Sequence, residues 1–404
     1  MPTVRPPPIL LLQGLNFLIG LGSFLTAMTA TSAWNRAGWS AVAIGAAMTA
    51  ANLCYALLAS TGGRLSDGWG RARTGALGAV VSAVGCALAL AITSAETAAA
   101  AAMLAFAGAA LFYPGNVGLF SDAPAAVGGA LPLHVKISRY NLGWACGNFG
   151  GFVGYFAFAK LPTAAGFGLS LASYLAVAVI LLRYRRLPAH SLPAEGDRSP
   201  HPALPRLILM GRLGLTIASI LAMAQIALLQ VVLRTMQVPV DQAAAWTGLT
   251  LTCYAASYIA MFILLGAWDG WVLKPWRLFL LQSGFLLGSL GYAALGWWGE
   301  PSAPALIVCG MLVGSAFGAA YTASIFYSLR LPHGAGRAAA LHETFIGVGN
   351  TAGPVLGGLV LWWWNGQQVA NGLVGLGLFM AVMAMIGLGL QVAMIPGAVR
   401  LGAR

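Results

Sequence analysis

His342 and Glu343 stand next to each other inside a long apolar stretch of the sequence. The pair begins like the zinc-binding helix motif H-E-x-x-H, but Ile346 stands where the second histidine would be. No lysine follows a glycine as it would in a phosphate-binding loop, so the sequence does not indicate direct use of ATP. We therefore expect no metal, no cofactor and no enzymatic activity.

Glu343 is unusual because the chain has only 9 acidic residues, and this one falls well inside an apolar segment. An ionised carboxylate is costly in hydrocarbon, so Glu343 should either be paired with a cation or carry a proton. Two roles follow from this. Glu343 pairs with Arg71 or Arg139 as part of a gate, or it gains and loses a proton during a transport cycle.

A second polar group lies between two apolar runs, where residues 63–74 read G-R-L-S-D-G-W-G-R-A-R-T. Asp67 can point at the start of a neighbouring helix, where unpaired N–H groups carry partial positive charge. Arg71 and Arg73 are expected near the lipid headgroups. The tripeptide D-G-W returns at Asp269, so we interpret both aspartates as gate residues, with a simple topology-fixing turn as the alternative.

The composition places all these residues in a membrane. Hydrophobic residues make up 59% of the chain and charged residues 7%, whereas roughly one quarter is charged in soluble domains. A hydrocarbon core about 30 Å thick needs roughly 20 apolar residues per helix. Twelve segments fit, at 9–31, 41–60, 75–93, 97–120, 133–159, 167–182, 213–233, 244–268, 277–297, 303–329, 338–362 and 369–395. The first resembles a signal peptide, but its length favours a retained helix.

The basic residues predict the orientation. With the N-terminus inside, only Arg36, Lys160 and Arg234 fall outside, so 18 of the 21 Lys and Arg residues lie at cytoplasmic ends or in cytoplasmic loops. Both termini are therefore expected in the cytoplasm, and a bacterial inner membrane is the expected location. The net charge of +12 is interpreted as a topology signal, so no nucleic-acid partner is expected.

The chain divides into two halves around a proline-rich polar segment. We predict an N-terminal six-helix bundle at 1–186, a linker at 187–211 and a C-terminal six-helix bundle at 212–404. The halves share short sequences in the same order: D-G-W at 67–69 and 269–271, and G-A-A at 108–110 and 318–320. A parallel internal repeat explains these matches. The predicted fold class is an all-α integral membrane protein with twelve transmembrane helices in two pseudo-symmetric six-helix bundles.

The loop motif resembles the signature G-x-L-x-D-x-x-G-R of the major facilitator superfamily. The matching residues are Gly63, Leu65, Asp67, Gly70, Arg71 and Arg73, and a degenerate copy comprises Asp269, Lys274 and Arg277. The family pattern G-x-x-x-G-P-x-x-G-G matches the segment at 338–362, with Gly349, Gly353, Pro354, Gly357 and Gly358. The segment at 133–159 has Gly143, Gly147, Gly150 and Gly151 without the proline of this pattern. Glycines spaced by four let two membrane helices approach closely, so we expect these stripes to be mainly structural.

The resemblance implies a central cavity between the halves. The first, fourth, seventh and tenth of the twelve segments line it, and the second, fifth, eighth and eleventh contribute. Polar and aromatic side chains midway along these helices are the candidates for binding a substrate. They are Asn16, Ser23, Asn52, Tyr55, Tyr113, Asn141, Trp144, Asn148, Gln225, Tyr254, Tyr258, Tyr321, Ser324 and Asn350. Residues 141, 144 and 148 share one helix face, as do 254 with 258 and 321 with 324. Hydrogen bonds between helices are the alternative role for each.

The resemblance also implies the function. We predict a secondary active transporter that moves a small organic solute by alternating access, with proton-coupled efflux as one form. An uptake or facilitated-diffusion carrier of the same fold and a membrane sensor that does not transport are the alternatives. The expected partners are a small-molecule substrate, the lipid bilayer and protons, and the chain is expected to act as a monomer.

Overall fold

The computed structural model describes residues 7–122, 132–158, 162–186, 202–299, 301–330, 335–366 and 372–402. Within these ranges every helix or strand assigned is an α-helix. The helices are α1 (Ile9–Arg36), α2 (Ala41–Trp69), α3 (Arg71–Ala91), α4 (Ala95–Asp122), α5 (Leu133–Phe158), α6 (Thr163–Arg183), α7 (Leu204–Thr235), α8 (Val240–Ala267), α9 (Pro275–Gln282), α10 (Gly284–Trp298), α11 (Ala303–Ser328), α12 (Ala335–Gly366) and α13 (Gly372–Gly402).

Most of these helices are long and apolar enough to cross a bilayer. The described ranges contain 11 spans that meet both conditions, and Pro275–Trp298 counts as one of them although the helix is interrupted at Ser283 between α9 and α10. The helix α5 has the length of a span, but Lys136 and Arg139 lower its hydropathy. With α5 included, the fold is the predicted one of twelve membrane helices in two six-helix bundles.

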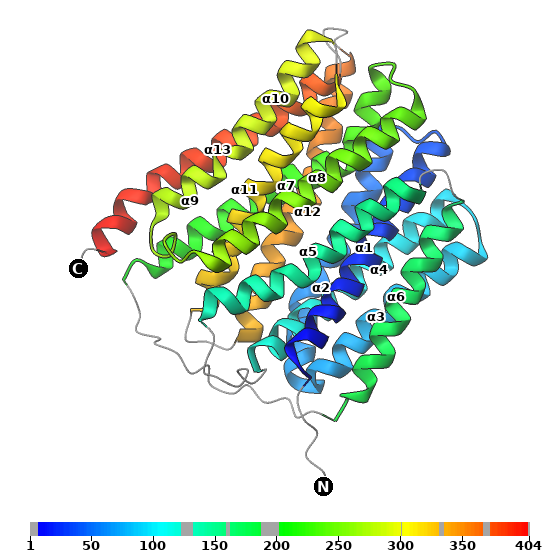
Figure 1. The fold of residues 1–404 in the computed structure, drawn as a ribbon. Coiled ribbons are helices and arrows are strands. Elements are labelled where there is room, and N and C mark those ends of the chain that lie inside the picture. The colour runs from blue at the N-terminus through cyan, green and yellow to red at the C-terminus, as the bar shows by residue number, and fades with distance from the viewer. Residues whose placement is uncertain are drawn as a thin grey trace.

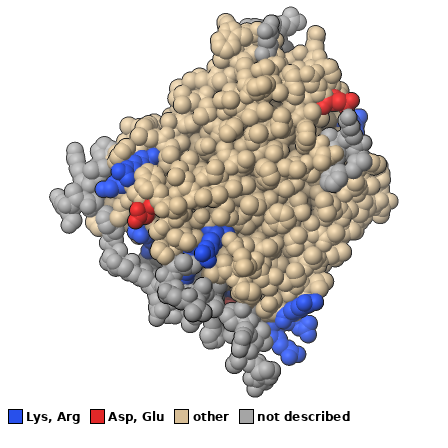
Figure 2. All heavy atoms as spheres, viewed as in Figure 1, with Lys and Arg blue, Asp and Glu red and all other residues tan. Residues whose placement is uncertain are grey.

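The two bundles comprise α1–α6 and α7–α13, and they lie side by side in Figure 1. The helix α1 begins and α13 ends towards the lower left of that view. We call this the basic end, because Arg64, Arg73, Lys136 and Lys274 lie there. On the face seen in Figure 2, charged side chains lie towards the ends of the bundles and leave a broad uncharged middle. That distribution suits a hydrocarbon core.

The predicted linker is shorter than expected at its C-terminal side. Residues 204–211 were assigned to the linker, but they form the first two turns of α7. Pro205 stands at the start of this helix, where its missing N–H costs no hydrogen bond. The prolines of this segment indicated a linker, whereas Pro205 begins a helix. Residues 187–201 of the predicted linker lie outside the described residues.

The two glycine stripes pack as the sequence predicted. A Cβ on Gly147 of α5 would overlap the backbone of Phe17 in α1. A Cβ on Gly353 of α12 would overlap the backbone of Ile220 in α7. The pairs α1–α5 and α7–α12 occupy corresponding places in the two bundles. The stripes therefore perform the same close-packing role in each half.

The repeated tripeptides, in contrast, occupy different environments. In the first D-G-W, Trp69 is half exposed, whereas Trp271 in the second is fully buried and its Nε1 donates to the carbonyl of Leu265. In the two G-A-A sequences, Gly108 packs on α3 but Gly318 packs on α8, which corresponds to α2. The repeat is visible in the helix order, and these short matches do not mark equivalent contacts.

The halves meet along two helix pairs. The α2–α12 seam brings Gly347 so close to α2 that a Cβ there would lie 2.7 Å from the Cα of Ala56. The α5–α8 seam joins Ser138 to α8 through a hydrogen bond of 2.9 Å to the carbonyl of Phe262. A pocket lies between these two seams, and it is built from both halves.

Candidate functional site

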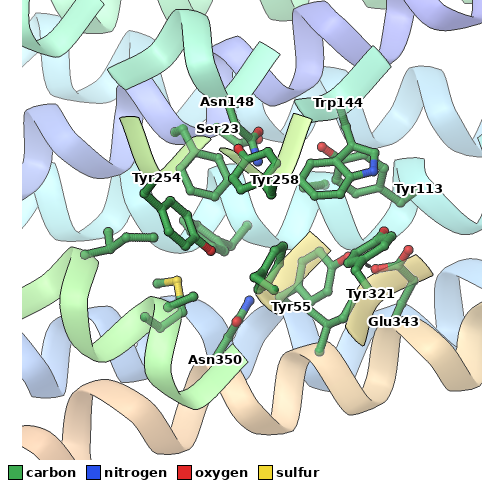
Figure 3. Close-up of a pocket in the computed structure, with 18 residues that line it drawn as sticks. Ser23, Tyr55, Tyr113, Trp144, Asn148, Tyr254, Tyr258, Tyr321, Glu343 and Asn350 are labelled. Atoms are coloured by element: carbon green, nitrogen blue, oxygen red, sulfur yellow. Dashed lines mark hydrogen bonds between the residues drawn. The ribbon is translucent and has the colours of Figure 1, made fainter. Parts of the chain in front are cut away.

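The central pocket takes side chains from all eight of the segments predicted to line it, which form α1, α2, α4, α5, α7, α8, α11 and α12. Nine of the predicted binding residues line it: Ser23, Tyr55, Tyr113, Trp144, Asn148, Tyr254, Tyr258, Tyr321 and Asn350. The predicted coupling residue Glu343 also lines it. In Figure 3, Ser23 and Asn148 lie on one side of the pocket and Asn350 lies on the other.

Apolar side chains complete the wall. They are Phe24, Phe106, Ala109, Ala222, Met223, Ile226, Phe317 and Ile346. Most of these residues could not be predicted as lining residues, because nothing in the sequence distinguishes them from the other apolar residues of the same helices. Phe317 was within reach of prediction, since it lies one helical turn from Tyr321 on the same face.

Five predicted binding residues lie outside the pocket. Asn16 accepts a hydrogen bond from Asn116 and donates one to the carbonyl of Tyr140, so it links α1, α4 and α5. The amide of Asn52 donates to the carbonyl of Met48 in its own helix, at 2.8 Å. The structure therefore gives these two residues hydrogen bonds within the protein.

The other three residues are Asn141, Gln225 and Ser324. Both side-chain polar atoms of Asn141 and of Gln225 are buried without a hydrogen-bond partner among the described residues. Ser324 Oγ lies 3.0 Å from Nδ1 of His342, so this pair joins α11 to α12. His342 was considered only as part of a zinc motif, and its position next to Glu343 was the signal that could have marked it.

The hydrogen-bond partner of Glu343 is Tyr55. The Tyr55 hydroxyl donates to Oε2 of Glu343 across the α2–α12 seam, and both residues are buried. The predicted pairing with Arg71 or Arg139 is not present in the structure. Arg139 is exposed at the start of α5. The guanidinium of Arg71 donates to the carbonyl of Gly118 in α4.

Arg71 also packs against protein, because only 7% of its surface is exposed, and its place near the headgroups stays a prediction. It follows directly after Gly70, whose φ of 112° turns the chain from α2 into α3 and aims the side chain inward. Arg73 remains exposed, and its Nε donates to the carbonyl of Arg185 at 2.9 Å. Arg71 is thus packed inside the N-terminal bundle.

An aromatic cluster closes the basic side of the pocket. The ring of Trp144 from the N-terminal half lies 4.7 Å from that of Tyr321, 5.4 Å from Phe262 and 5.7 Å from Tyr258 in the C-terminal half. Phe317 lies 5.6 Å from Tyr258 and extends the cluster along α11. Edge-to-face and tilted contacts of this kind stabilise packed rings. Trp144 therefore joins the two halves.

Four polar atoms in the pocket wall lack a hydrogen-bond partner within the described ranges. They are the indole Nε1 of Trp144, Oδ1 of Asn148, the hydroxyl of Tyr258 and Oε1 of Glu343. Their residues are at most 6% exposed. Buried polar groups are normally hydrogen-bonded, so four open ones around one pocket indicate a site for a ligand or for water. The set contains the indole donor, two acceptors and a hydroxyl that can do either, which suits a polar organic molecule.

Contacts between the halves also lie at the end opposite the basic end. Arg234 of α7 donates to the side chain of Asn35 in α1 at 3.3 Å, and Tyr155 of α5 donates to Gln230 of α7 at 2.9 Å. The cavity between the two ends has a volume of about 100 Å³. Pockets for organic ligands are usually roughly 300 Å³ or larger. The structure thus shows the pocket in a contracted form.

The predicted gate aspartates lie near the basic end. Asp67 is exposed in the last turn of α2 and lines a hollow of about 520 Å³ together with Arg64 and with Ala340 and Thr344 of α12. It therefore faces the first turns of α12, as a latch would. Asp269 is exposed in the turn after α8, where its carbonyl accepts from the N–H of Val272.

The pocket lining contains one acidic side chain and no basic one. Glu343 is the only ionisable acid among the 18 lining residues, and none of them is Lys, Arg or His. In the part of the chain that the structure describes, no group of three His, Cys, Asp or Glu side chains could hold a metal ion. The five cysteines are free, and Cys86 lies 3.4 Å from the hydroxyl of Thr26. The pocket is thus aromatic, uncharged apart from one carboxyl group, and shared by both halves.

A family model with the description Major Facilitator Superfamily matches residues 13–342. The chain belongs to the major facilitator superfamily. No curated protein matches the chain closely enough to count as a relative. Solved structures of the superfamily do match over nearly the whole length, at low sequence identity.

Three of these structures illustrate the likeness. The human organic anion transporter MFSD10 (TETRAN) is 16% identical with a TM-score of 0.65, and the match covers 95% of this chain and 100% of the other. The nucleoside transporter NupG, as a D323A mutant, is 17% identical with a TM-score of 0.61 and coverages of 96% and 99%. FucP in the outward conformation is 14% identical with a TM-score of 0.61 and coverages of 95% and 98%.

Membership of the major facilitator superfamily makes this chain a multi-pass membrane transporter. The likeness to the solved structures concerns the fold alone, because all three are under 20% identical. The superfamily thus accounts for the two bundles and for a small-molecule substrate, and the chemistry of the pocket must come from the chain's own residues.

Proposed function

We propose that the protein is a proton-coupled secondary transporter that exports a small organic solute by alternating access. The central pocket is its substrate site, and Glu343 is the group that takes up and releases the proton. The carrying observation is that Glu343 lines the pocket with one oxygen bonded to Tyr55 and the other without a partner. A carboxyl group in that position can meet both the substrate and a proton from either side.

The partner of Glu343 favours this role over the gate role. A gate ion pair requires a cation beside the carboxylate, whereas the contact here is a tyrosine hydroxyl. Glu343 lies eight residues after Ala335, or roughly 12 Å along the helix, so it is well removed from the end of α12. A hydroxyl partner leaves the carboxyl group free to change its protonation state without losing a salt bridge.

Alternating access is supported by the contacts between the halves. The cavity is contracted, and both ends carry contacts between α1–α6 and α7–α13. A substrate could enter only if one set of these contacts separates. The two seams provide the surfaces about which the bundles would rock, with Asp67 as a latch at the basic end.

The direction of transport follows from the proposed orientation. We place the basic end in the cytoplasm, with both termini there, and the chain in a bacterial inner membrane as a monomer. An inward proton gradient would then drive export by exchange. Among the matched structures, one is an organic anion transporter and another a nucleoside transporter. The lining without Lys or Arg suits an organic anion poorly.

The experiment starts with a thermal-shift screen of the purified protein against a library of small organic compounds. Hits are then tested for flux into proteoliposomes with and without an imposed pH gradient. We expect at least one compound to accumulate against its gradient only when the pH differs across the membrane. Flux that merely equilibrates would point to facilitated diffusion, and binding without flux would point to a sensor.

A further inference from the structure

We infer that the substrate is an aromatic organic cation, and that its positive charge and a proton compete for Glu343. This inference rests on the proposed function and names the class of substrate for that site. The observations behind it are the charge balance of the pocket, the open oxygen of Glu343 and the aromatic rings around it.

The charge balance disfavours an organic anion and restricts a neutral solute. An organic anion would be buried beside a carboxyl group with no Lys, Arg or His in the lining. A buried charge without a partner is strongly disfavoured. A neutral solute would leave an ionised Glu343 unpaired, so it could bind only while the carboxyl group keeps its proton. A cation alone supplies the charge that an ionised Glu343 lacks.

The rings offer the rest of the site. Tyr55 and Tyr321 lie beside the carboxyl group in Figure 3, and Trp144, Tyr254, Tyr258 and Phe317 also line the pocket. Aromatic faces attract a cation through the ring quadrupole, most strongly where water is excluded. An ammonium or pyridinium group could therefore sit at Oε1 of Glu343 with an apolar body between the rings.

The groups that face Glu343 do not supply a competing cation. Tyr55 on α2, Tyr113 on α4, Tyr140 on α5 and Tyr321 on α11 lie close enough to interact with its charge, and all four are neutral when protonated. On its own helix, the neighbouring His342 turns to Ser324.

The basic groups nearby lie outside the pocket lining. The guanidinium of Arg212 on α7 lies 5.4 Å from the centre of the Phe345 ring, and two of its nitrogens have no hydrogen-bond partner among the described residues, but Arg212 does not line the pocket. Arg64 and Asp67 of α2 lie in the separate hollow near the basic end. The cation for an ionised Glu343 must then come from outside the protein.

The consequence is an exchange of one proton for one cation. With the pocket open to the cytoplasm, a monovalent cation binds to Glu343 and the proton leaves. With the pocket open to the other side, a proton binds and the cation leaves. Each cycle exports one cation and imports one proton, so it moves no net charge across the membrane.

The test uses three para-substituted probes of one shape: N-methyl-phenylpyridinium as the cation, methylbiphenyl as the neutral compound and biphenyl carboxylate as the anion. Their binding to the purified full chain is measured by calorimetry. Proton release is followed with an indicator dye in weak buffer. We expect the cation to bind at least roughly tenfold tighter than the other two, as a desolvated cation–π contact would provide. We also expect its affinity to rise with pH, because fewer protons then compete, and each bound cation to release a proton.

Two variants separate the site from general effects. Glu343→Gln should lose the preference for the cation and the proton release, while it binds methylbiphenyl like the wild type, which shows that the pocket is intact. Glu343→Asp should keep the preference. Glu96→Gln removes an exposed carboxyl group at the start of α4 and should change neither quantity.

The inference is overturned if the anion or the neutral probe binds as tightly as the cation, if no proton is released, if Glu343→Gln binds the cation like the wild type, or if no probe binds. The proposed function is judged by a different result, the transport assay. Accumulation of any library compound that depends on the pH gradient across the proteoliposome membrane would uphold it even if the preference for cations were absent.

Discussion

The two seams between the halves occupy corresponding places, yet they differ in chemistry. The α2–α12 seam joins an ionisable side chain to a hydroxyl, Glu343 to Tyr55, at the pocket wall. The α5–α8 seam joins rings at the same pocket, with Trp144 against Tyr258 and Phe262. A carboxyl group responds to protons, whereas a set of packed rings responds to the shape of what enters. The difference indicates that coupling resides on one seam and substrate fit on the other.

The largest expected effect comes from the aromatic seam. Trp144→Ala removes a buried ring that contacts rings of α8 and α11, and such losses cost about 3 to 5 kcal/mol. Thermal unfolding in detergent should show a clear fall in the transition temperature. Trp297→Ala serves as the control, because that side chain is 77% exposed and its loss should change little. Equal effects of both substitutions would mean that Trp144 does not hold the halves together.

A smaller effect is expected on the α2–α12 seam. Tyr55→Phe keeps the ring and removes the hydroxyl that donates to Glu343. Hydrogen bonds to charged groups contribute about 1.5 to 3 kcal/mol, so pH-driven accumulation should fall roughly tenfold or more. Initial rates in proteoliposomes with an imposed pH gradient measure this.

Tyr113→Phe is the matched control for Tyr55→Phe, because Tyr113 lines the same pocket and no hydrogen bond between its side chain and the described residues is found. It should leave the coupling intact. A fall in accumulation of the same size in both variants would remove the special role assigned to the Tyr55 hydroxyl.

These outcomes show what a sequence can predict about such a pocket. Helical spacing correctly indicated that Trp144 and Asn148 share a face, and both line the pocket. The same spacing included Asn141, which lies roughly one turn nearer the basic end than Trp144 and falls beyond the aromatic cluster. A shared helical face tells in which direction side chains point around the helix axis. It does not tell where along that axis the pocket lies, because this depends on how the partner helices pack.

Ser324 repeats this lesson on α11, since it lies one turn nearer the basic end than Tyr321 and bonds to His342. The helix order, the bundles and the glycine stripes were predictable because they depend on composition and local spacing. The partner of Glu343 was not, because Tyr55 and Glu343 are 288 positions apart and the sequence offered Arg71 and Arg139 as the candidate partners.

The smallest effects compare one hydrogen bond from each seam. Ser138→Ala removes the bond to the carbonyl of Phe262, and Thr49→Val removes the bond of 3.1 Å to the carbonyl of Thr351. Hydrogen bonds between membrane helices average about 0.6 kcal/mol, so either change should shift the unfolding temperature only slightly. A much larger shift for one of them would show that its seam carries more of the contact between the halves than described above.

The central claim is that Glu343 carries the transported proton, and the pH inside proteoliposomes tests it most directly. Vesicles contain the wild type or Glu343→Gln and a trapped pH indicator, and a substrate found in the screen is added outside. We expect the wild type to change the internal pH as substrate enters, and Glu343→Gln to exchange labelled for unlabelled substrate without any change in pH. A pH change of wild-type size in the Glu343→Gln vesicles would contradict the account.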